Sequence, residues 1–465
     1  MNTVTQTQSS SYDKLNAAVE SIGMKSVHYR IILLVAAGSL FNVIEQYNIG
    51  FAVPLIIAEW GISPGEAGLL SSVTFASMAI SSLASGKLAD RFGRKPIFMW
   101  NVALFTVGAL VAALAPNYAV LLIGRIVVGI GLGGEMALGF TIIAELIPTK
   151  RRGSAAATIS LLQGGVGIFA AAGLAALILG PLSAALGGDR LTWRFLLGVM
   201  FLPAVLILFY RRYIPESPRY LLKTGRIDEL NRTLSLLSIN RLRAKEQLTV
   251  TNFVDAGAVV PASMVVRTRE LFQRGRVKVT CVAWLMATCL FGTVATATIF
   301  VPLVLVDAGY SSGTAAAIAT LINFGGLLGA LLGIACAHRI PRRRVGLGTG
   351  ILAVAAALVL TQPLSTAAIV AVAFTLIFIL EVMAGSFWGY VPELYSTRLR
   401  GFGTGTAVTV ALLVGATASP ILGGSLYSSG GCLALFTFLA VLCLVYAVSA
   451  WNGPETHGKH LLEES

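Results

Sequence analysis

Charged residues are scarce in this sequence. Only 12% of its 465 residues are Asp, Glu, Lys or Arg, and 56% are hydrophobic. Soluble domains are about 25% charged. The shortage disfavours a water-soluble enzyme, a disordered chain and a nucleic-acid-binding domain, because a chain this apolar can hide its surface only in lipid.

Cysteine and histidine are also few, with five and four residues. The cysteines, all inside apolar stretches and without metal-type spacing, are Cys281, Cys289, Cys336, Cys432 and Cys443. We interpret them as buried, inert thiols. The sequence contains no Gly-x-x-x-x-Gly-Lys-Ser/Thr motif, so ATP is not expected to drive its activity. We predict no enzyme activity, no metal and no cofactor.

Apolar stretches dominate the chain, and each is about long enough to cross a bilayer, which takes about 20 residues in a helix. Their limits are 31–57, 67–87, 97–115, 118–146, 154–180, 194–213, 279–305, 314–337, 345–361, 366–391, 403–424 and 431–450. The runs are continuous rather than alternating, which favours helices over a membrane barrel. The predicted fold class is therefore an all-α membrane protein with twelve transmembrane helices.

The basic residues are distributed unevenly along these stretches. Of 34 Lys and Arg, only Arg190 and Arg194 fall on one side and Arg125 falls inside a span, so 31 lie on the other side. The positive-inside rule makes that side cytoplasmic, with both termini. The net charge of +13 then reflects orientation and not a nucleic-acid partner.

A polar segment divides the stretches into two groups of six. We predict a cytoplasmic segment over 1–30, helix bundles over 31–213 and 279–451, a cytoplasmic linker over 214–278 and a tail over 452–465. The two groups carry matching loops, since Glu145, Leu146, Thr149, Arg152 and Gly153 recur 248 positions later, from Glu393 to Gly401. Arg91 and Arg94 align with Arg339 and Arg342 at the same offset. We infer an internal duplication, which is typical of transporters.

Several motifs resemble those of the major facilitator superfamily. Residues 86–95 (GKLADRFGRK) resemble its loop signature between spans 2 and 3. Residues 215–219 (PESPR) and 454–456 (PET) are similar to signatures of its sugar-porter-like branches. The resemblance implies two six-helix bundles that work by alternating access.

Residues 41–54 and 390–398 are similar to the aromatic-acid and nicotinate groups of bacterial metabolite:proton symporters, which extend to synaptic-vesicle glycoproteins. The resemblance implies proton-coupled uptake of a small organic acid, aromatic or nicotinate-like, by a monomer in the bacterial plasma (inner) membrane. Its partners would be the solute, protons and the lipid bilayer. The alternatives are a sugar or polyol, an organic cation, a multidrug exporter and a non-transporting receptor on the same fold.

Charged groups inside membrane spans are costly and point to function. Glu45 lies about 22 Å from the cytoplasmic end of its span, and Arg125 about 10 Å from the outer end of its own. Although these distances are counted from opposite ends, they place both side chains at overlapping depths in the membrane. The two charges are therefore expected to pair. Sugar-porter relatives use such an acid–arginine pair, which implies proton coupling by Glu45 and Arg125. The alternative is a static bridge that fixes helix packing.

Two further acids are candidates for proton coupling. Glu135 either lines the cavity or bonds to a neighbouring helix. Glu381, Gly385 and Trp388 share one helix face, and we expect Gly385 to leave open space between the acid and the indole. Glu381 is either a substrate or proton group, or a hydrogen-bonded packing acid.

A site of a few polar groups among aromatic rings suits a small solute. The candidate substrate-binding residues are Gln46, Tyr47, Asn48, Gln163, Trp284, Asn323, Phe387, Trp388 and Tyr390. Each of them alone could equally be a packing residue. No Lys or Arg lies near the middle of the second group of spans, so a bound carboxylate would need Arg125, helix dipoles or side-chain amides.

The charged loops are candidates for a cytoplasmic gate. Its predicted members are Asp90, Arg91, Arg94, Glu145, Arg152, Glu216, Arg339, Arg342, Glu393 and Arg400. The family resemblance implies that they bridge the two halves when the cytoplasmic side is closed. The alternative is that they only set topology, because individual surface ion pairs contribute only about 0–1 kcal/mol.

Overall fold

The computed structural model describes residues 2–243, 249–255, 268–273, 276–336, 340–396 and 399–456, and within them the secondary structure is helical without strands. The first half contains α1 (Asn2–Ile22), α2 (Ser26–Trp60), α3 (Pro64–Phe92), α4 (Arg94–Ala113), α5 (Tyr118–Leu146), α6 (Thr149–Leu161), η1 (Leu162–Val166), α7 (Gly167–Leu179), α8 (Asp189–Gly198), η2 (Val199–Phe201) and α9 (Ala204–Tyr213). The linker holds α10 (Pro218–Lys223), α11 (Ile227–Ser238) and η3 (Thr268–Phe272). The second half contains α12 (Val277–Asp307), α13 (Ser312–Cys336), α14 (Arg342–Val359), α15 (Thr366–Glu393), α16 (Arg400–Val410), η4 (Ala411–Ala416) and α17 (Thr417–Asn452).

The helices account for all twelve apolar stretches. Ten helical segments of the described chain are long and apolar enough to cross a membrane. One of them, Arg400–Asn452, contains two of the predicted stretches, because the backbone leaves helical geometry at Gly431 (φ 57°, ψ −147°). The 18-residue α14, which begins with three arginines, accounts for the remaining stretch. The prediction of an all-α membrane fold is confirmed.

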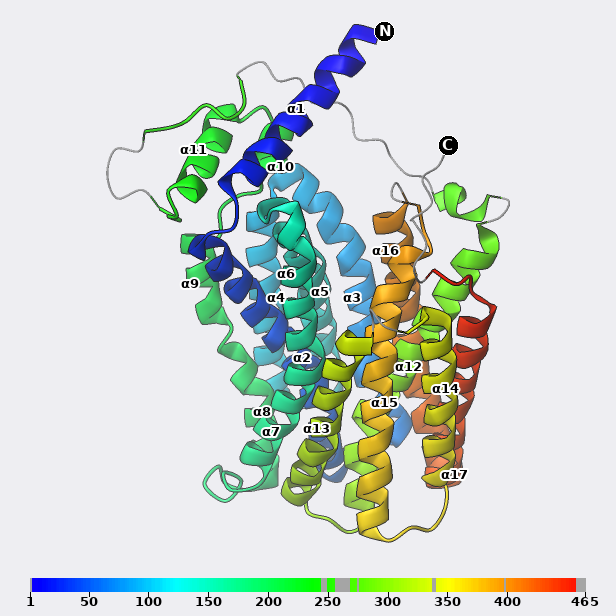
Figure 1. Cartoon of the computed structure of the whole chain (residues 1–465). Helices are drawn as coiled ribbons and strands as arrows, with labels where there is room; N and C mark the ends of the chain where they lie inside the picture. Colours follow the sequence, from blue (N-terminus) through cyan, green and yellow to red (C-terminus); the bar gives the residue numbers. More distant parts are fainter. Residues whose placement is uncertain are drawn as a thin grey trace.

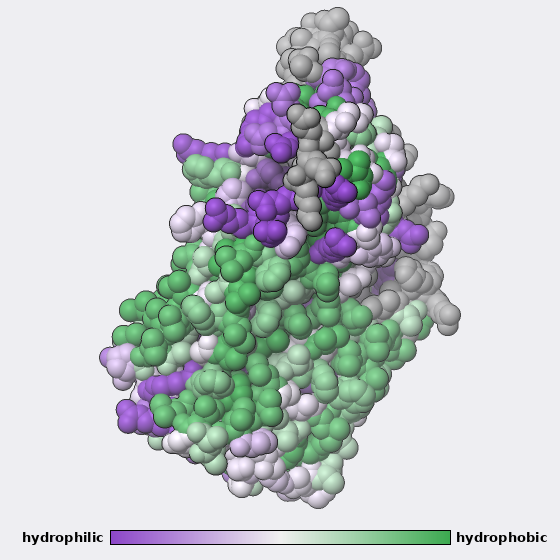
Figure 2. Space-filling view, turned by 90° about the vertical axis from the view of Figure 1, so that its left-hand side faces the viewer, coloured by the Kyte–Doolittle hydropathy of each residue, from purple (hydrophilic) through white to green (hydrophobic). Residues whose placement is uncertain are grey.

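Polar residues concentrate at one end of the molecule. Both termini, α1, α10 and α11 lie at this end, which we call the terminal face (Figure 1). Below it runs a broad apolar surface (Figure 2), to which exposed side chains such as Leu33, Trp100 and Leu208 contribute. A large exposed apolar surface marks a membrane or protein interface, and on this side of the molecule it covers helices of membrane-spanning length.

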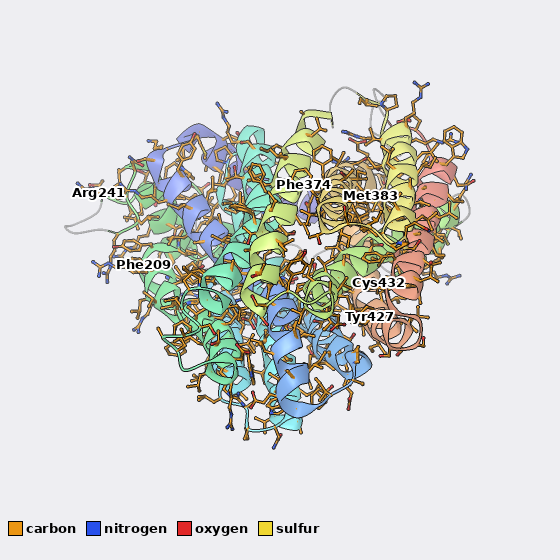
Figure 3. All side chains as sticks on the ribbon, turned by 90° about the horizontal axis from the view of Figure 1, so that it is seen from below. Phe209, Arg241, Phe374, Met383, Tyr427 and Cys432 are labelled. Atoms are coloured by element: carbon orange, nitrogen blue, oxygen red, sulfur yellow. The ribbon has the colours of Figure 1, made fainter. Side chains whose placement is uncertain are left out.

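Each half has its own buried core. Ile31, Phe98 and Phe105 belong to the core of the first half, and Met383 and Tyr446 to that of the second. Figure 3, a view along the bundle, shows the labelled Phe209 on the first-half side and Met383 on the second-half side. A third buried cluster contains residues of both halves and joins the two cores where the halves meet.

The halves touch most closely toward the face opposite the termini. A Cβ on Gly68 of α3 would overlap the backbone carbonyl of Pro420 in α17, and one on Gly313 of α13 would lie 2.7 Å from the Leu179 carbonyl oxygen. Small residues permit such close helix contacts. The closure lies at the first turns of α3 and α13, far from the charged loops of the terminal face.

A charged cluster also fastens the first half at this opposite face. Glu59, near the end of α2, contacts Arg190 at 3.2 Å and Arg194 at 2.8 Å, and it accepts a hydrogen bond from Trp193 at 2.7 Å. These are the two arginines that the sequence places apart from the other basic residues. The cluster joins α2 to α8.

At the terminal face, α1 and the linker pack together. Leu15 and Val19 of α1 are buried in one cluster with Leu230 and Leu234 of α11. Glu20 accepts a hydrogen bond from the backbone N–H of Thr149 at 2.6 Å, at the start of α6. The segment predicted as a cytoplasmic linker therefore includes a helix, α11, that packs with α1 over the first half.

Candidate functional site

Glu45 and Arg125 form a buried ion pair at the centre of the first half. Arg125 Nη1 lies 2.6 Å from Glu45 Oε1, and the side chains are 1% and 0% exposed. Arg125 Nε also donates to Thr74 Oγ1 at 3.1 Å. The pair therefore links α2 to α5, and Thr74 adds α3. Glu45 Oε2 has no hydrogen-bond partner among the described residues.

Glycines of α5 bring Thr74 to the arginine. A Cβ on Gly129 would overlap the Thr74 carbonyl, and one on Gly133 would overlap the backbone of Met78. Only glycine permits α3 and α5 to approach this closely. The glycine-rich run after Arg125 thus sets the polar surroundings of the guanidinium.

A second polar network lies beside the pair. Asn42 Nδ2 donates to Glu135 Oε2 at 2.6 Å and to the Leu132 carbonyl at 3.0 Å, and Gln46 Nε2 donates to Asn42 Oδ1 at 2.5 Å. Of the two roles open to Glu135, the structure shows the bond to a neighbouring helix. Glu135 Oε1 has no hydrogen-bond partner in the described part of the chain.

Asn42 and Thr74 contact the buried charges but are not among the residues predicted from the sequence. Asn42 precedes Glu45 by three residues and Gln46 by four, which places all three on one side of α2. This spacing is the signal by which Asn42 could have been identified from the sequence. The sequence carries no such signal for Thr74, because a single threonine in an apolar helix usually donates to a carbonyl of its own helix. Thr74 does so as well, since its hydroxyl donates to the Leu70 carbonyl at 2.9 Å.

A small cavity lies between the halves. Tyr47 and Phe51 of α2 line it from the first half, and Thr298 and Asn323 are among its lining residues from the second. Its volume is about 20 Å³, which suffices for about one water molecule. The structure thus brings the predicted Tyr47 and Asn323 together around a nearly closed space.

Glu381 also lies where the halves meet. A Cβ on Gly164 of η1 would be 3.2 Å from Glu381 Oε2, so the carboxylate faces the π-helical turn of the first half. The prediction that Gly385 leaves open space beside Glu381 is wrong. Gly333 of α13 packs against Gly385, and its Cα would lie 3.2 Å from a Cβ there.

Three predicted cavity residues lie inside one half instead. Asn48 is buried and donates to the Leu196 carbonyl of α8 at 3.4 Å. Phe387 is fully buried in the second core. Tyr390 is 1% exposed and donates to the Pro454 carbonyl at 2.6 Å, which fastens the tail to α15. The expectation that these side chains line the cavity is therefore wrong for this conformation.

The remaining aromatic and polar candidates are partly accessible. Trp284 is half-buried, stacks edge-on with Phe272 and donates to Thr406 at 3.4 Å. Trp388 is exposed beside Phe291 of α12, with ring centroids 6.2 Å apart. Gln163 is half-buried in η1, one residue before the glycine that Glu381 faces. None of these three lines the small cavity.

The charged loop of the first half forms a compact network at the terminal face. Arg94 lies 2.8 Å from Asp90 and 3.4 Å from Glu145, and Ser217 donates a hydrogen bond to Glu145. Glu216 accepts from the backbone N–H of Arg94 at 2.9 Å. Gly93 stands at the N-cap of α4 but has no side chain to accept a hydrogen bond there. The Glu216 carboxylate accepts it instead and so caps the helix.

The second half repeats this arrangement. Arg342 lies 3.0 Å from Glu393, and Thr456 donates to Glu393 at 2.6 Å. Arg342 and Glu393 stand 248 positions after Arg94 and Glu145. Ser217 and Thr456 each end a Pro-Glu-Ser/Thr run and play the same part, so each run fastens a chain segment to its own half.

Among the described residues, no ion pair of the predicted gate joins the two halves. Arg94 pairs with Asp90 and Glu145 of the first half, and Arg342 pairs with Glu393 of the second. Arg152 Nε donates to the Ile147 carbonyl at 2.8 Å, Arg91 lies over Phe92, and two guanidinium nitrogens of Arg400 are buried without a partner among the described residues. Arg339 lies outside the described residues. The physical reason is that the halves make their closest contacts at the opposite face, which leaves the charged loops to local partners.

No three His, Cys, Asp or Glu side chains of the described chain lie close enough together to hold a metal ion. Of the buried acids at the site, Glu45 pairs with a guanidinium and Glu135 accepts from an amide. The arrangement can couple the positions of α2, α3 and α5 through a buried ion pair.

Comparisons with known proteins agree with the fold. The family model described as "Sugar (and other) transporter" matches residues 18–464. The niacin transporter NiaP of Acinetobacter baylyi is 26% identical over 96% of this chain and 98% of its own length. The glucose transporter GlcP of Staphylococcus epidermidis is 28% identical over 95% of this chain and 97% of its own. A structure of the xylose transporter XylE from E. coli, described as partially occluded and inward open, covers 94% of this chain and 100% of its own with a TM-score of 0.74 and 19% identity.

Proposed function

Because the chain belongs to the sugar (and other) transporter family of the major facilitator superfamily, we propose that it couples uptake of a small organic acid to proton entry by alternating access. The observation that carries this proposal is the buried Glu45–Arg125 pair, with one carboxylate oxygen left unpartnered. The proposed substrate is an aromatic or nicotinate-like acid, and no cofactor is required.

The terminal face is the cytoplasmic side in this proposal. The basic loops and linker lie there, as the positive-inside rule requires. The halves are closed at the opposite face, so the conformation is one that faces the cell interior. In the outward-facing state, the charged networks around Glu145 and Glu393 would exchange local partners for partners across the halves.

Glu45 is the proposed proton carrier. When the carboxylate takes up a proton, its attraction to the Arg125 guanidinium is lost, and the contact between α2 and α5 weakens. Glu45 sits two residues before Tyr47, which lines the cavity. A change at the pair therefore reaches the substrate space through a single turn of α2. Glu135 and Glu381 are further candidate proton groups at the same level of the bundle.

The cavity lining supports an aromatic acid. Tyr47 and Phe51 offer ring faces, and Asn323 offers an amide. Asn323 Nδ2 uses one N–H for the Ala319 carbonyl at 2.8 Å, and an amide nitrogen carries two. The second N–H can donate to a carboxylate. The niacin transporter NiaP, similar along nearly the whole chain, supports the same class.

A sugar is the second candidate. The glucose transporter GlcP is as similar as NiaP in extent and identity, and amide and hydroxyl groups bind sugar hydroxyls as readily as carboxylates. Binding tests on the purified protein with nicotinate, benzoate, glucose, xylose and a quaternary amine separate the classes. Stabilisation against heat by the two acids alone supports the proposal, and stabilisation by a sugar alone replaces it.

Glu45→Gln tests the coupling. In proteoliposomes, each pH unit of gradient drives about tenfold accumulation per coupled proton. The variant should lose this accumulation, because Gln cannot carry a proton, and should retain exchange of labelled for unlabelled substrate. Glu66→Gln, an exposed helix-capping acid at the opposite face, serves as the control and should accumulate normally. Full accumulation by Glu45→Gln would refute the assignment.

A further inference from the structure

A second cavity of the described chain does not lie between the halves. It is a groove of about 240 Å³ between the first turns of α2 and α6. Tyr29, Leu33 and Ala36 line it from α2, and Arg151, Ser154 and Thr158 line it from α6. All of these residues belong to the first half, so the groove stands apart from the substrate site.

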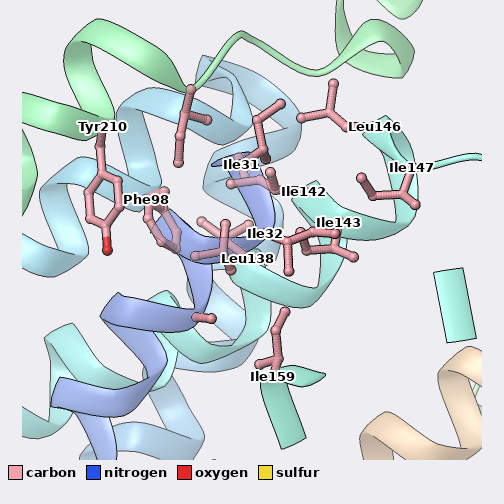
Figure 4. Packing of buried hydrophobic residues seen from close by; sticks show 14 of the residues in the cluster. Ile31, Ile32, Phe98, Leu138, Ile142, Ile143, Leu146, Ile147, Ile159 and Tyr210 are labelled. Atoms are coloured by element: carbon pink, nitrogen blue, oxygen red, sulfur yellow. The ribbon is translucent and has the colours of Figure 1, made fainter. Parts of the chain in front are cut away.

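The groove opens to the outside of the bundle. Tyr29 is 60% and Leu33 68% exposed, and α2 and α6 lie side by side toward the viewer below the terminal face (Figure 1). Its floor rests on the packed core of the first half, where Ile32 and Ile159 are labelled in Figure 4. Large apolar side chains this exposed in a membrane-spanning helix face lipid.

The chemistry of the groove changes along its length. Toward α7 and the bilayer interior it is apolar, and at the terminal face it carries a guanidinium. Arg151 is exposed and forms no ion pair with the described residues. Arg30, next to Tyr29, is a second exposed cation at this end of α2. The hydroxyls of Ser154 and Thr158 donate to carbonyls of their own helix at 2.9 and 3.0 Å, which leaves Arg151 and the Tyr29 hydroxyl as donors for a ligand.

We propose that this groove binds an anionic phospholipid, with its phosphate at Arg151 and one acyl chain between α2 and α6. The groove runs about 10 Å along α2 from Tyr29 to Ala36 and about 16 Å from Arg151 of α6 to Leu162, the first residue of η1. The longer side matches the hydrocarbon of one leaflet, about 15 Å. Basic pockets between helices at the cytoplasmic surface bind acidic headgroups. The leaflet assignment rests on the orientation under the proposed function, but binding itself does not.

Lipid binding to the purified full-length protein tests the proposal. Titration with phosphatidylglycerol and phosphatidylcholine, followed by native mass spectrometry and thermal unfolding, should show tighter binding of the anionic lipid. Arg151→Gln should weaken phosphatidylglycerol binding about fivefold, the effect of one arginine near the surface, and leave phosphatidylcholine unchanged. Arg344→Gln, an exposed arginine at the terminal face of the second half, is the matched control and should bind both lipids like the wild type.

A second variant tests the contribution of the acyl chain separately from that of the headgroup. Ser154→Leu fills the groove without changing charge and should weaken both lipids. Equal binding of the two lipids by the wild type, or unchanged binding by both variants, would overturn the proposal. Binding of free glycerol phosphate as tight as that of the lipid would overturn it too, because the apolar groove would then play no part. These measurements need neither substrate nor a pH gradient, so they can refute lipid binding without bearing on the transport proposal.

Discussion

Removal of Arg125 should destabilise the protein far more than removal of both members of its ion pair. The guanidinium lies 2.6 Å from Glu45 Oε1, and both side chains are at most 1% exposed. With charge centres about 4 Å apart and an effective dielectric constant of about 20, the attraction is about 4 kcal/mol. Loss of one partner from a buried pair costs about 3–5 kcal/mol, because the other charge stays behind.

Three variants separate these contributions. Arg125→Leu should lower the free energy of unfolding by about 3–5 kcal/mol. Arg125→Leu combined with Glu45→Gln removes both charges of the pair and should lose only about 1–2 kcal/mol, the scale of a hydrogen bond. Arg190→Leu removes a 78% exposed partner of Glu59 and should cost about 0–1 kcal/mol.

The assay is denaturant unfolding of the purified protein in detergent, followed by far-UV circular dichroism. A loss of 4 kcal/mol changes the folding equilibrium constant by about a thousandfold, well beyond the error of the method. The reasoning would be refuted if Arg125→Leu cost less than the double variant, or no more than Arg190→Leu.

Two further predictions concern the contacts between and within the halves. Gly68→Val should push α3 away from the Pro420 carbonyl, so distances between spin labels across the opposite face, measured by double electron–electron resonance, should lengthen. Gly86→Val on the same helix meets open space and should leave these distances unchanged. Equal distances in the two variants would count against closure at the opposite face. Ser217→Ala should lower the free energy of unfolding by about 2 kcal/mol and Thr456→Val by about 1 kcal/mol. The order follows from burial, since the glutamate that Ser217 contacts is 8% exposed and the one that Thr456 contacts is 28% exposed; the reverse order in thermal unfolding would contradict it.

The buried pair could be predicted because depth in a membrane is a one-dimensional quantity. Glu45 and Arg125 each lie in a long apolar run, so counting residues from the ends of the helices places both at similar levels. The cost of an isolated charge in lipid then requires that they meet. The same logic does not reach Asn42 or Thr74, because polar side chains without charge are common in membrane helices.

The lining of the cavity was only partly predictable, for a different physical reason. Tyr47 and Asn48 are neighbours, yet one lines the space between the halves and the other bonds to α8. Successive residues on a helix point about 100° apart, so the rotation of the helix decides which of them meets the substrate space. That rotation is set by packing against other helices. Phe387 and Tyr390 were misplaced for the same reason.

By itself, the sequence determined the class, the spans, the repeat and the charged pair. Long apolar runs, a fixed offset between matching loops and a few intramembrane charges are properties of one chain read in order. Only the tertiary structure decided that the loop charges pair within each half and that the closure lies at the opposite face. It alone showed a groove on the outside of α2 and α6. These features depend on which helices approach one another, and that follows from close packing between glycines and backbones distant in the chain.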